Sequence, residues 1–74
     1  MPVNLKSIKS LKIRKANSIY KGLTATFYDS NENPVYQMSL LDDNASVDSL
    51  RDDLMEMVDS FIAEHGIQLK RKEN

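Results

Sequence analysis

The residues in this sequence that could do chemistry are chiefly cations set among polar and aromatic side chains. Lys12 and Arg14 alternate with apolar residues, and Tyr28 ends a second alternating stretch that also carries Thr24 and Thr26. Cations close to an aromatic ring can hold phosphate groups and stack bases. The sequence therefore predicts a candidate nucleic-acid surface that consists of Lys9, Lys12, Arg14, Lys15, Lys21 and Tyr28, with further cations at Lys70, Arg71 and Lys72. The alternative is a solvated face whose lysines protect an edge strand from pairing.

Residues suited to catalysis or metal binding are scarce. The chain has one histidine and no cysteine, so neither a Cys–His nucleophile nor a thiolate metal site can be assembled. The run Asp29-x-Asn31-x-Asn33 begins like a calcium-binding loop, but Pro34 and Leu40 stand where that loop needs a glycine and a bidentate glutamate. We therefore interpret residues 29–34 as a hairpin loop, and we expect no enzymatic activity, no metal and no cofactor.

The charges are distributed unevenly along the chain, although the net charge is only −1. Residues 1–28 contain six cations and no acid, residues 29–64 contain ten acids with Arg51 as their one cation, and residues 65–74 contain three cations and one acid. Separate patches of opposite sign suit contact with a complementary protein or with a second copy of the same chain. The candidate partner-binding residues are Arg51, Asp52, Glu56 and Asp59.

Arg51 is the one cation among the acids of residues 29–64, and it projects towards the apolar side of a helix that is predicted after Ser46. One interpretation is a side chain at the edge of the apolar stripe that extends its charge into water and pairs with Asp42 or Asp43. The other is an exposed anchor at a partner interface, where arginine is enriched. The sequence leaves both interpretations open.

Alternation of apolar and polar residues predicts three strands, near residues 9–15, 20–28 and 35–41, separated by turn residues at 16–18 and 29–34. The apolar side chains on one face of these strands are Leu11, Ile13, Leu23, Ala25, Phe27, Tyr36, Met38 and Leu40. The opposite face is left open to water or to a partner, and it consists of Lys12, Arg14, Thr24, Thr26, Tyr28, Gln37 and Ser39.

A helix is predicted after the third strand. Ser46 suits the N-cap, and Asp48 places a negative charge in the first turn. The apolar residues that recur at spacings of three and four are Val47, Leu50, Leu54, Met57, Val58, Phe61 and Ile62. Gly66 suits the left-handed residue that ends a helix, and Ile67 then stands where it can contact Ile62 in a Schellman motif.

The order of elements predicts an α+β fold, β-β-β-α, in which one C-terminal amphipathic helix packs on a three-stranded antiparallel sheet. Residues 67–70 could add a short fourth strand at one edge. We expect a single domain over residues 1–74, with its core between about 9 and 69 and with flexible ends at 1–7 and 70–74. The residues expected to be buried together are Leu23, Phe27, Met38, Leu40, Leu54, Val58 and Phe61.

These features predict a small non-enzymatic protein-binding module, either a homodimeric adaptor or a phage or bacterial inhibitor of a host protein. The alternative is nucleic-acid binding through the basic sheet face. At the level of fold alone, the layout is similar to that of the arm-binding domains of phage and transposon integrases, which lay a sheet on DNA. No run approaches the roughly 18 apolar residues of a membrane span, and the basic first residues lack the apolar segment of a secretory signal, so we expect no membrane partner and a cytoplasmic protein.

Overall fold

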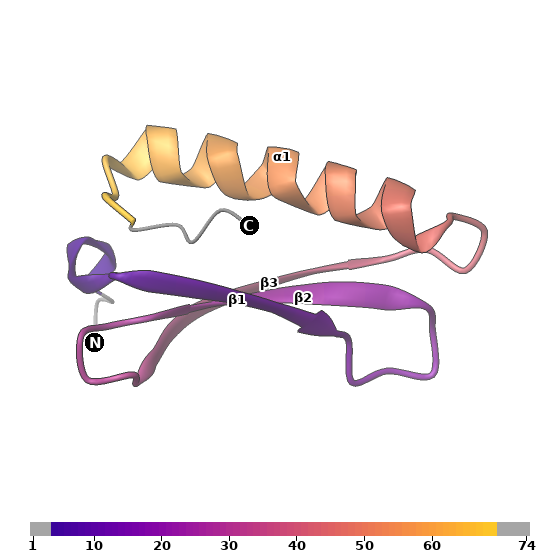
Figure 1. Ribbon diagram of the computed structural model, residues 1–74, viewed down its shortest axis with the longest axis horizontal. Helices are drawn as coiled ribbons and strands as arrows, with labels where there is room; N and C mark the ends of the chain where they lie inside the picture. Colours follow the sequence, from indigo (N-terminus) through magenta and orange to yellow (C-terminus); the bar gives the residue numbers. More distant parts are fainter. Residues whose placement is uncertain (1–3, 70–74) are drawn as a thin grey trace.

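Three antiparallel strands and one long helix make up the described part of the chain, which covers residues 4–69 in this computed structural model (Figure 1). The elements follow in the order η1 (Leu5–Ser7), β1 (Ser10–Lys15), β2 (Gly22–Tyr28), β3 (Pro34–Leu41) and α1 (Val47–His65). The strands pair in the order β1-β2-β3, and α1 lies across one face of the sheet (Figure 1). The predicted α+β fold with the order β-β-β-α is therefore confirmed.

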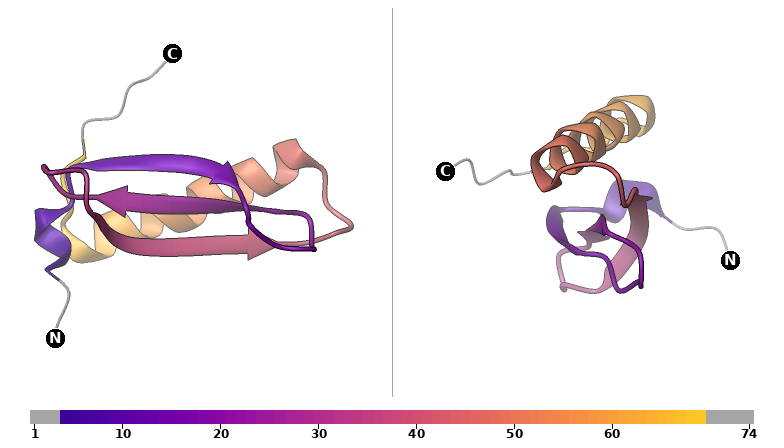
Figure 2. Two further views of the ribbon diagram at one scale, coloured as in Figure 1. Left: turned by 90° about the horizontal axis from the view of Figure 1, so that it is seen from below. Right: turned by 90° about the vertical axis from the view of Figure 1, so that its right-hand side faces the viewer.

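The register of the sheet sorts the side chains into the two faces that the alternation predicts. Leu11 lies opposite Phe27, and Phe27 lies opposite Tyr36, so these residues share the face that α1 covers. Lys12 lies opposite Thr26 on the other face. No helix of the described residues covers that second face, which is turned towards the viewer in the left panel of Figure 2.

The second strand begins at Gly22, two residues later than the sequence predicts. Ile19 and Tyr20 lie instead in the loop between β1 and β2, where they are 92% and 55% exposed. β2 approaches β3 so closely at Gly22 that an added Cβ would come within 2.5 Å of the carbonyl oxygen of Leu40. A glycine is therefore required where the close pairing of the two strands starts.

Both ends of α1 are capped as the sequence predicts. The Ser46 hydroxyl accepts a hydrogen bond of 3.1 Å from the backbone N–H of Ser49. At the other end Gly66 adopts a left-handed conformation with φ of 63°, and its N–H donates to the carbonyl oxygen of Ile62. The N–H of Ile67 donates to the same oxygen over 3.1 Å. These bonds satisfy backbone groups that a helix end leaves without partners, and they set the bounds of α1.

The core lies between α1 and the central part of the sheet, because α1 packs over β2 and β3. The buried residues are Ile8, Leu23, Ala25, Phe27, Leu50, Leu54, Val58 and Ile67. Met38, Leu40 and Phe61, which the sequence also places in the core, are only partly buried and pack against the margin of this cluster. Their partial exposure follows from their position where α1 meets the edge strand β3.

The segments before β1 and after α1 contain residues of the core that the sequence did not predict. Leu5–Ser7 form a 3-10 turn capped by the side chain of Asn4, and Ile8 directly after the turn is buried. Ile67 also turns into the core, and no strand forms among residues 67–69, so the expected fourth strand is absent from the described residues. The expected flexible residues 1–3 and 70–74 lie outside the described part of the chain.

Replacing Phe27 by alanine tests the position of this core. The Phe27 side chain is fully buried, and its ring centre lies 5.2 Å from that of Phe61. Loss of a buried phenylalanine costs about 3–5 kcal/mol, which approaches the whole stability of a small domain. We expect Phe27→Ala to be largely unfolded in urea or thermal melts followed by circular dichroism. Ile19→Ala, in an exposed loop, is the control and should melt with the wild type; equal melting of Phe27→Ala would contradict the assigned core.

Candidate functional site

The uncovered face of the sheet carries the polar residues that the alternation predicts. They are Lys12, Arg14, Thr24, Thr26, Tyr28, Gln37 and Ser39. The hydroxyl oxygens of Thr24 and Ser39 lie 2.8 Å apart and share a hydrogen bond. Lys12 Nζ lies 5.3 Å from the centre of the Tyr28 ring, so this cation already occupies one face of the aromatic ring.

The six residues of the predicted nucleic-acid surface are spread along the whole length of β1. Lys9 precedes the strand, and its backbone N–H donates to the carbonyl oxygen of Tyr28 over 2.7 Å. Lys15 and Lys21 lie at the other end, where they line a hollow beside α1. Only Lys12, Arg14 and Tyr28 share the uncovered face.

A hollow of about 420 Å³ lies between the end of β1, the start of β2 and the first turns of α1. Its lining includes the apolar residues Ile13, Leu23, Val47 and Leu50 and the four cations Arg14, Lys15, Lys21 and Arg51, which we call the basic flank. In the described residues Arg51 forms no ion pair with Asp42 or Asp43. The carboxylate of Asp43 instead accepts the backbone N–H of Lys21 over 2.6 Å. The hollow therefore combines an apolar surface with several cations.

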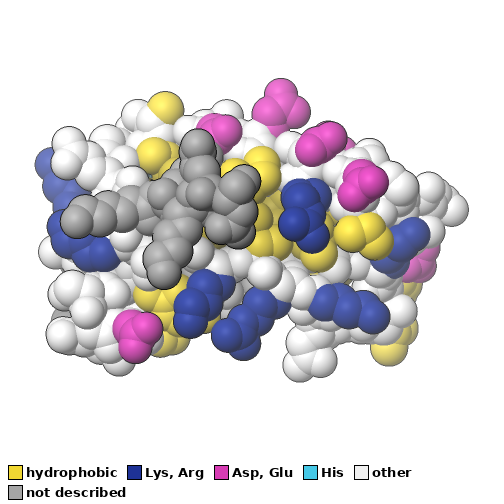
Figure 3. Space-filling model, in the orientation of Figure 1, with side chains coloured by type: hydrophobic (Ala, Val, Ile, Leu, Met, Phe, Trp, Pro, Cys, Tyr) yellow, Lys and Arg dark blue, Asp and Glu magenta, His cyan; other side chains and the backbone are white. Residues whose placement is uncertain are grey.

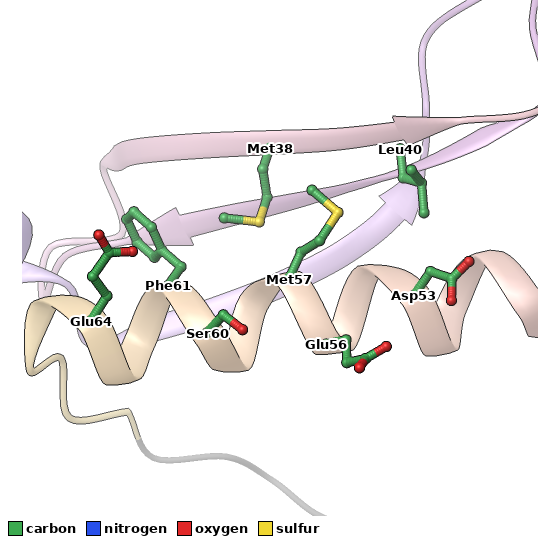
Figure 4. Close-up of a pocket in the computed structure, with 8 residues that line it drawn as sticks. All are labelled: Met38, Leu40, Asp53, Glu56, Met57, Ser60, Phe61 and Glu64. Carbon is green, nitrogen blue, oxygen red and sulfur yellow. The ribbon is translucent and has the colours of Figure 1, made fainter.

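A shallow groove of about 530 Å³ lies on the opposite side of α1, between the helix and β3 (Figure 4). Its apolar lining consists of Met38, Leu40, Met57 and Phe61. Met38 and Met57 extend from the strand and the helix into the space between them (Figure 4). Met57 is 40% exposed, although its spacing places it in the apolar stripe of the helix. The helix also contributes Ser60 and three acids, Asp53, Glu56 and Glu64, which we call the acidic flank.

Aromatic stacking holds β3 against α1 beside this groove. The rings of Tyr36 and Phe61 are nearly parallel, with centres 4.6 Å apart and an angle of 10° between their planes. The centre of the His65 ring lies 4.7 Å from that of Phe61, and the two ring planes are tilted by 56°. The single histidine thus packs against an aromatic ring, while Tyr36 stays 40% exposed.

The outer edge of β3 carries peptide groups that no described strand pairs. The N–H of Asp42 donates to the carbonyl oxygen of Lys21 over 2.8 Å, which sets the alternation of the antiparallel ladder. Gln37, Ser39 and Leu41 therefore direct their N–H and C=O groups away from β2. The strand is eight residues long and has no charged side chain, so its edge is open to a further strand.

Cations and acids occupy different parts of the face shown in Figure 3. In Figure 3 most Lys and Arg side chains gather along the sheet, and most Asp and Glu side chains lie along the outer side of the helix, with a hydrophobic strip between them. The uneven distribution of charge along the sequence is thus preserved in space.

The four candidate partner-binding residues of α1 do not form one surface. Arg51 belongs to the basic flank and Glu56 to the acidic flank, on opposite sides of the helix. Asp52 and Asp59 are exposed and line neither the hollow nor the groove. The groove and the other two acids of its flank, Asp53 and Glu64, are not predicted from the sequence. The signal that could have found it is the absence of any charge over residues 34–41.

The loop at Asp29 is a hairpin loop, as the sequence predicts. Asp29 Oδ1 accepts hydrogen bonds from the backbone N–H groups of Asn31, over 2.8 Å, and Asn33, over 2.9 Å. The carboxylate therefore closes the turn. Among residues 4–69, no three His, Cys, Asp or Glu side chains are grouped so that they could hold a metal ion.

Comparison with protein-family models, curated proteins and solved structures finds no match to this chain. No helix within residues 4–69 combines the length and the apolar character that crossing a membrane requires. The surfaces described above are therefore the basis for a proposal about function.

The Asp29 turn predicts a pH dependence of stability. Hydrogen bonds from the backbone N–H groups of Asn33 and Asn31 hold the pKa of the Asp29 carboxyl below its ordinary value of 3.8. Because the folded pKa is the lower one, the charged turn stabilises the fold above about pH 4 and loses this contribution as the pH falls through the folded pKa. We expect the difference in melting temperature between wild type and Asp29→Asn to shrink on acidification. An NMR titration that places the Asp29 pKa at or above 3.8 would contradict this account.

Proposed function

We propose that this chain is a small non-enzymatic protein-binding module that takes up an extended segment of its partner as an additional strand along β3. The observation that carries the proposal is the open edge of β3 beside a groove with exposed apolar side chains. In strand addition, main-chain hydrogen bonds supply affinity and pockets for alternate side chains supply specificity.

The contrast between the two edge strands supports this choice of edge. β1 carries Lys12, Arg14 and Lys15 within six residues, and such charges protect an edge from pairing. β3 has no charge over eight residues, and its one proline, Pro34, stands at the start of the strand, where it leaves the rest of the edge free. A basic or uncharged incoming strand therefore meets an obstacle at β1 and none at β3, whereas a strand flanked by acids would meet opposite charges at β1.

The side chains beside β3 suit an apolar residue of the partner. Every second residue of an added strand would point to the side of the sheet that α1 occupies, because side chains alternate between faces. There it would contact Met38 and Met57, whose flexible side chains adapt to different shapes. Burial of the exposed part of Met57 would add to the main-chain hydrogen bonds.

The charge of the groove selects a basic segment. Asp53, Glu56 and Glu64 line its helix side, and no cation of the described part of the chain does. Lysine or arginine at the ends of an extended segment would face these carboxylates. Pairing of β3 with β3 of a second copy is disfavoured, because it would bring two acidic flanks together. The expected partner segment is therefore extended, apolar at its centre and basic at its ends.

A blocked peptide, Lys-Thr-Val-Thr-Leu-Thr-Lys, tests the proposal. Its lysines, valine and leucine share one face, which would lie towards the groove, and its threonines share the other. We expect binding by the wild type in NMR titrations, with shift changes concentrated in β3 and the adjoining side of α1. Ser39→Pro removes an N–H from the open edge and should weaken binding about three- to tenfold, the worth of a hydrogen bond of roughly 0.5–1.5 kcal/mol.

Ser39→Ala is the matched control, since it loses the same hydroxyl contact with Thr24 but keeps the edge N–H. A peptide with glutamates in place of the lysines should bind more weakly, and Glu56→Gln should reduce that difference while Asp52→Asn leaves it unchanged. Equal binding of the peptide by Ser39→Pro and Ser39→Ala would contradict the assignment of the binding edge to β3.

Nucleic-acid binding is the second candidate, supported by the separation of cations from acids on the surface (Figure 3). Lys12 and Arg14 would contact phosphate groups together with Lys15 and Lys21 at the end of β1. Such contacts are independent of base sequence and release counterions, so binding would fall steeply with salt.

Labelled single- and double-stranded DNA and RNA, titrated at about 50 mM salt, test this candidate under conditions that favour electrostatic binding. The double variant Lys12→Ser, Arg14→Ser should weaken binding and lower the slope of log K against log salt by roughly two, about one per cation. Lys6→Ser, a change before β1, serves as the comparison for a cation outside the face. An absence of binding by the wild type at this salt concentration would remove the candidate.

A further inference from the structure

The two sides of α1 carry opposite charge. Within residues 4–69, the hollow beside β1 is lined by the basic flank and by no acid, and the groove beside β3 is lined by the acidic flank and by no cation. Both also expose apolar side chains, among them Val47 in the hollow, which is 48% exposed, and Met57 in the groove, which is 40% exposed. The two surfaces are thus complementary in charge and alike in apolar character.

Like charges disfavour both symmetric ways of joining two sheets. Pairing β3 with β3 of a second copy would bring two acidic flanks together, and pairing β1 with β1 would bring two basic flanks together. Like-charge contacts across an interface cost free energy and suppress those arrangements. The remaining arrangement joins β3 of one copy to β1 of the next.

The sequence of β1 fits the partner segment expected at β3. Leu11 and Ile13 lie on the side of the sheet that faces α1 and are only partly buried, and Lys15 follows on the same side. The N–H and C=O groups of these residues point to the open edge, because the N–H of Ala16 donates to the carbonyl oxygen of Gly22 over 3.0 Å. β1 thus presents an apolar centre with a basic end.

A second copy that is shifted sideways, perpendicular to the strands, would extend the sheet of the first copy in the same orientation. β1 and β3 are both antiparallel to β2 and therefore run parallel to each other. A simple translation would place β1 of the second copy beside β3, keep both helices on one side of the sheet, and turn the second copy's basic flank towards the acidic flank of the first. The helix packs mainly over β2 and β3 within its own copy, and Leu11 and Ile13 on the inner side of β1 pack against the margin of the core while staying partly exposed to a neighbour.

We propose that the chain associates head to tail, with β3 and the acidic flank of one copy receiving β1 and the basic flank of the next. This proposal rests on the proposed function, because it names a second copy of this chain as a segment that the β3 edge accepts. The interface is heterologous, so it leaves one free β1 edge and one free β3 edge at the ends of each assembly and continues as concentration rises.

Charge exchange tests the pairing directly. One variant carries Lys15→Glu and Arg51→Glu, and the other carries Asp53→Lys and Glu56→Lys. Each variant alone would place like charges across the proposed interface, whereas a mixture would restore opposite charges. We expect sedimentation at about 50 mM salt to show a wild-type mass that rises with protein concentration, monomers for each variant, and association in the equimolar mixture. The wild-type association should weaken roughly tenfold at about 500 mM salt.

The pair Lys6→Glu and Asp52→Lys, which changes charges outside both flanks, is the control and should associate as the wild type does. Circular dichroism establishes that each variant is folded. A wild type that stays monomeric up to about 1 mM overturns head-to-tail association, as does a mixture that stays monomeric while the wild type associates. If the Lys-Thr-Val-Thr-Leu-Thr-Lys peptide still binds a monomeric wild type at β3, the proposed function stands without self-association. If the wild type neither associates nor binds the peptide, both proposals are overturned.

Discussion

The packing of α1 over β2 and β3 is the contact on which the rest of the structure depends. A helix with its side chains is about 10–12 Å across, and one helix cannot cover the full width of a twisted three-stranded sheet evenly. Leu50, Leu54 and Val58 bury the central strand completely at Ala25 and Phe27. The edge strands keep partly exposed apolar side chains, and Ile8 and Ile67 supply further cover from outside the main elements. Two apolar margins beside the helix follow from this arrangement.

The charges beside these margins have a local cause in the sequence. Asp53, Glu56, Ser60 and Glu64 are spaced by three, four and four residues, so they form one ridge along the helix beside β3. Like charges at such spacings destabilise a helix by a few tenths of a kcal/mol per pair. The cations on the other side come mostly from β1 and the loop that follows it. A ridge of like charge next to exposed methionines costs stability, which is consistent with a surface that meets a partner.

The sequence predicts those features that depend on local periodicity and capping. Period-two alternation assigned Leu23, Ala25 and Phe27 to the covered face, and Ser46 and Gly66 marked the ends of the helix. Alternation cannot tell which strands lie directly under a helix, so Met38, Leu40 and Phe61 were expected to be buried like Phe27. Ile8 and Ile67 stand outside every periodic segment, and only tertiary packing brings them into the core. Local sequence patterns do not predict the groove either, because Met38 and Met57 come together from elements far apart in the chain.

Because α1 covers the sheet only partly, a strand that binds along β3 would also stabilise the fold. A chain of this size buries only about 60% of the surface that its unfolded form exposes, so its own core leaves little stability in reserve. A strand added along β3 would satisfy the peptide groups of Gln37 and Ser39 and cover the margin where Met57 is exposed and Met38 is partly buried. Any segment that binds the folded chain and not the unfolded one stabilises the fold in proportion to the logarithm of its concentration. The edge left open by a single helix is thus a place where a partner strand would add both hydrogen bonds and buried apolar surface.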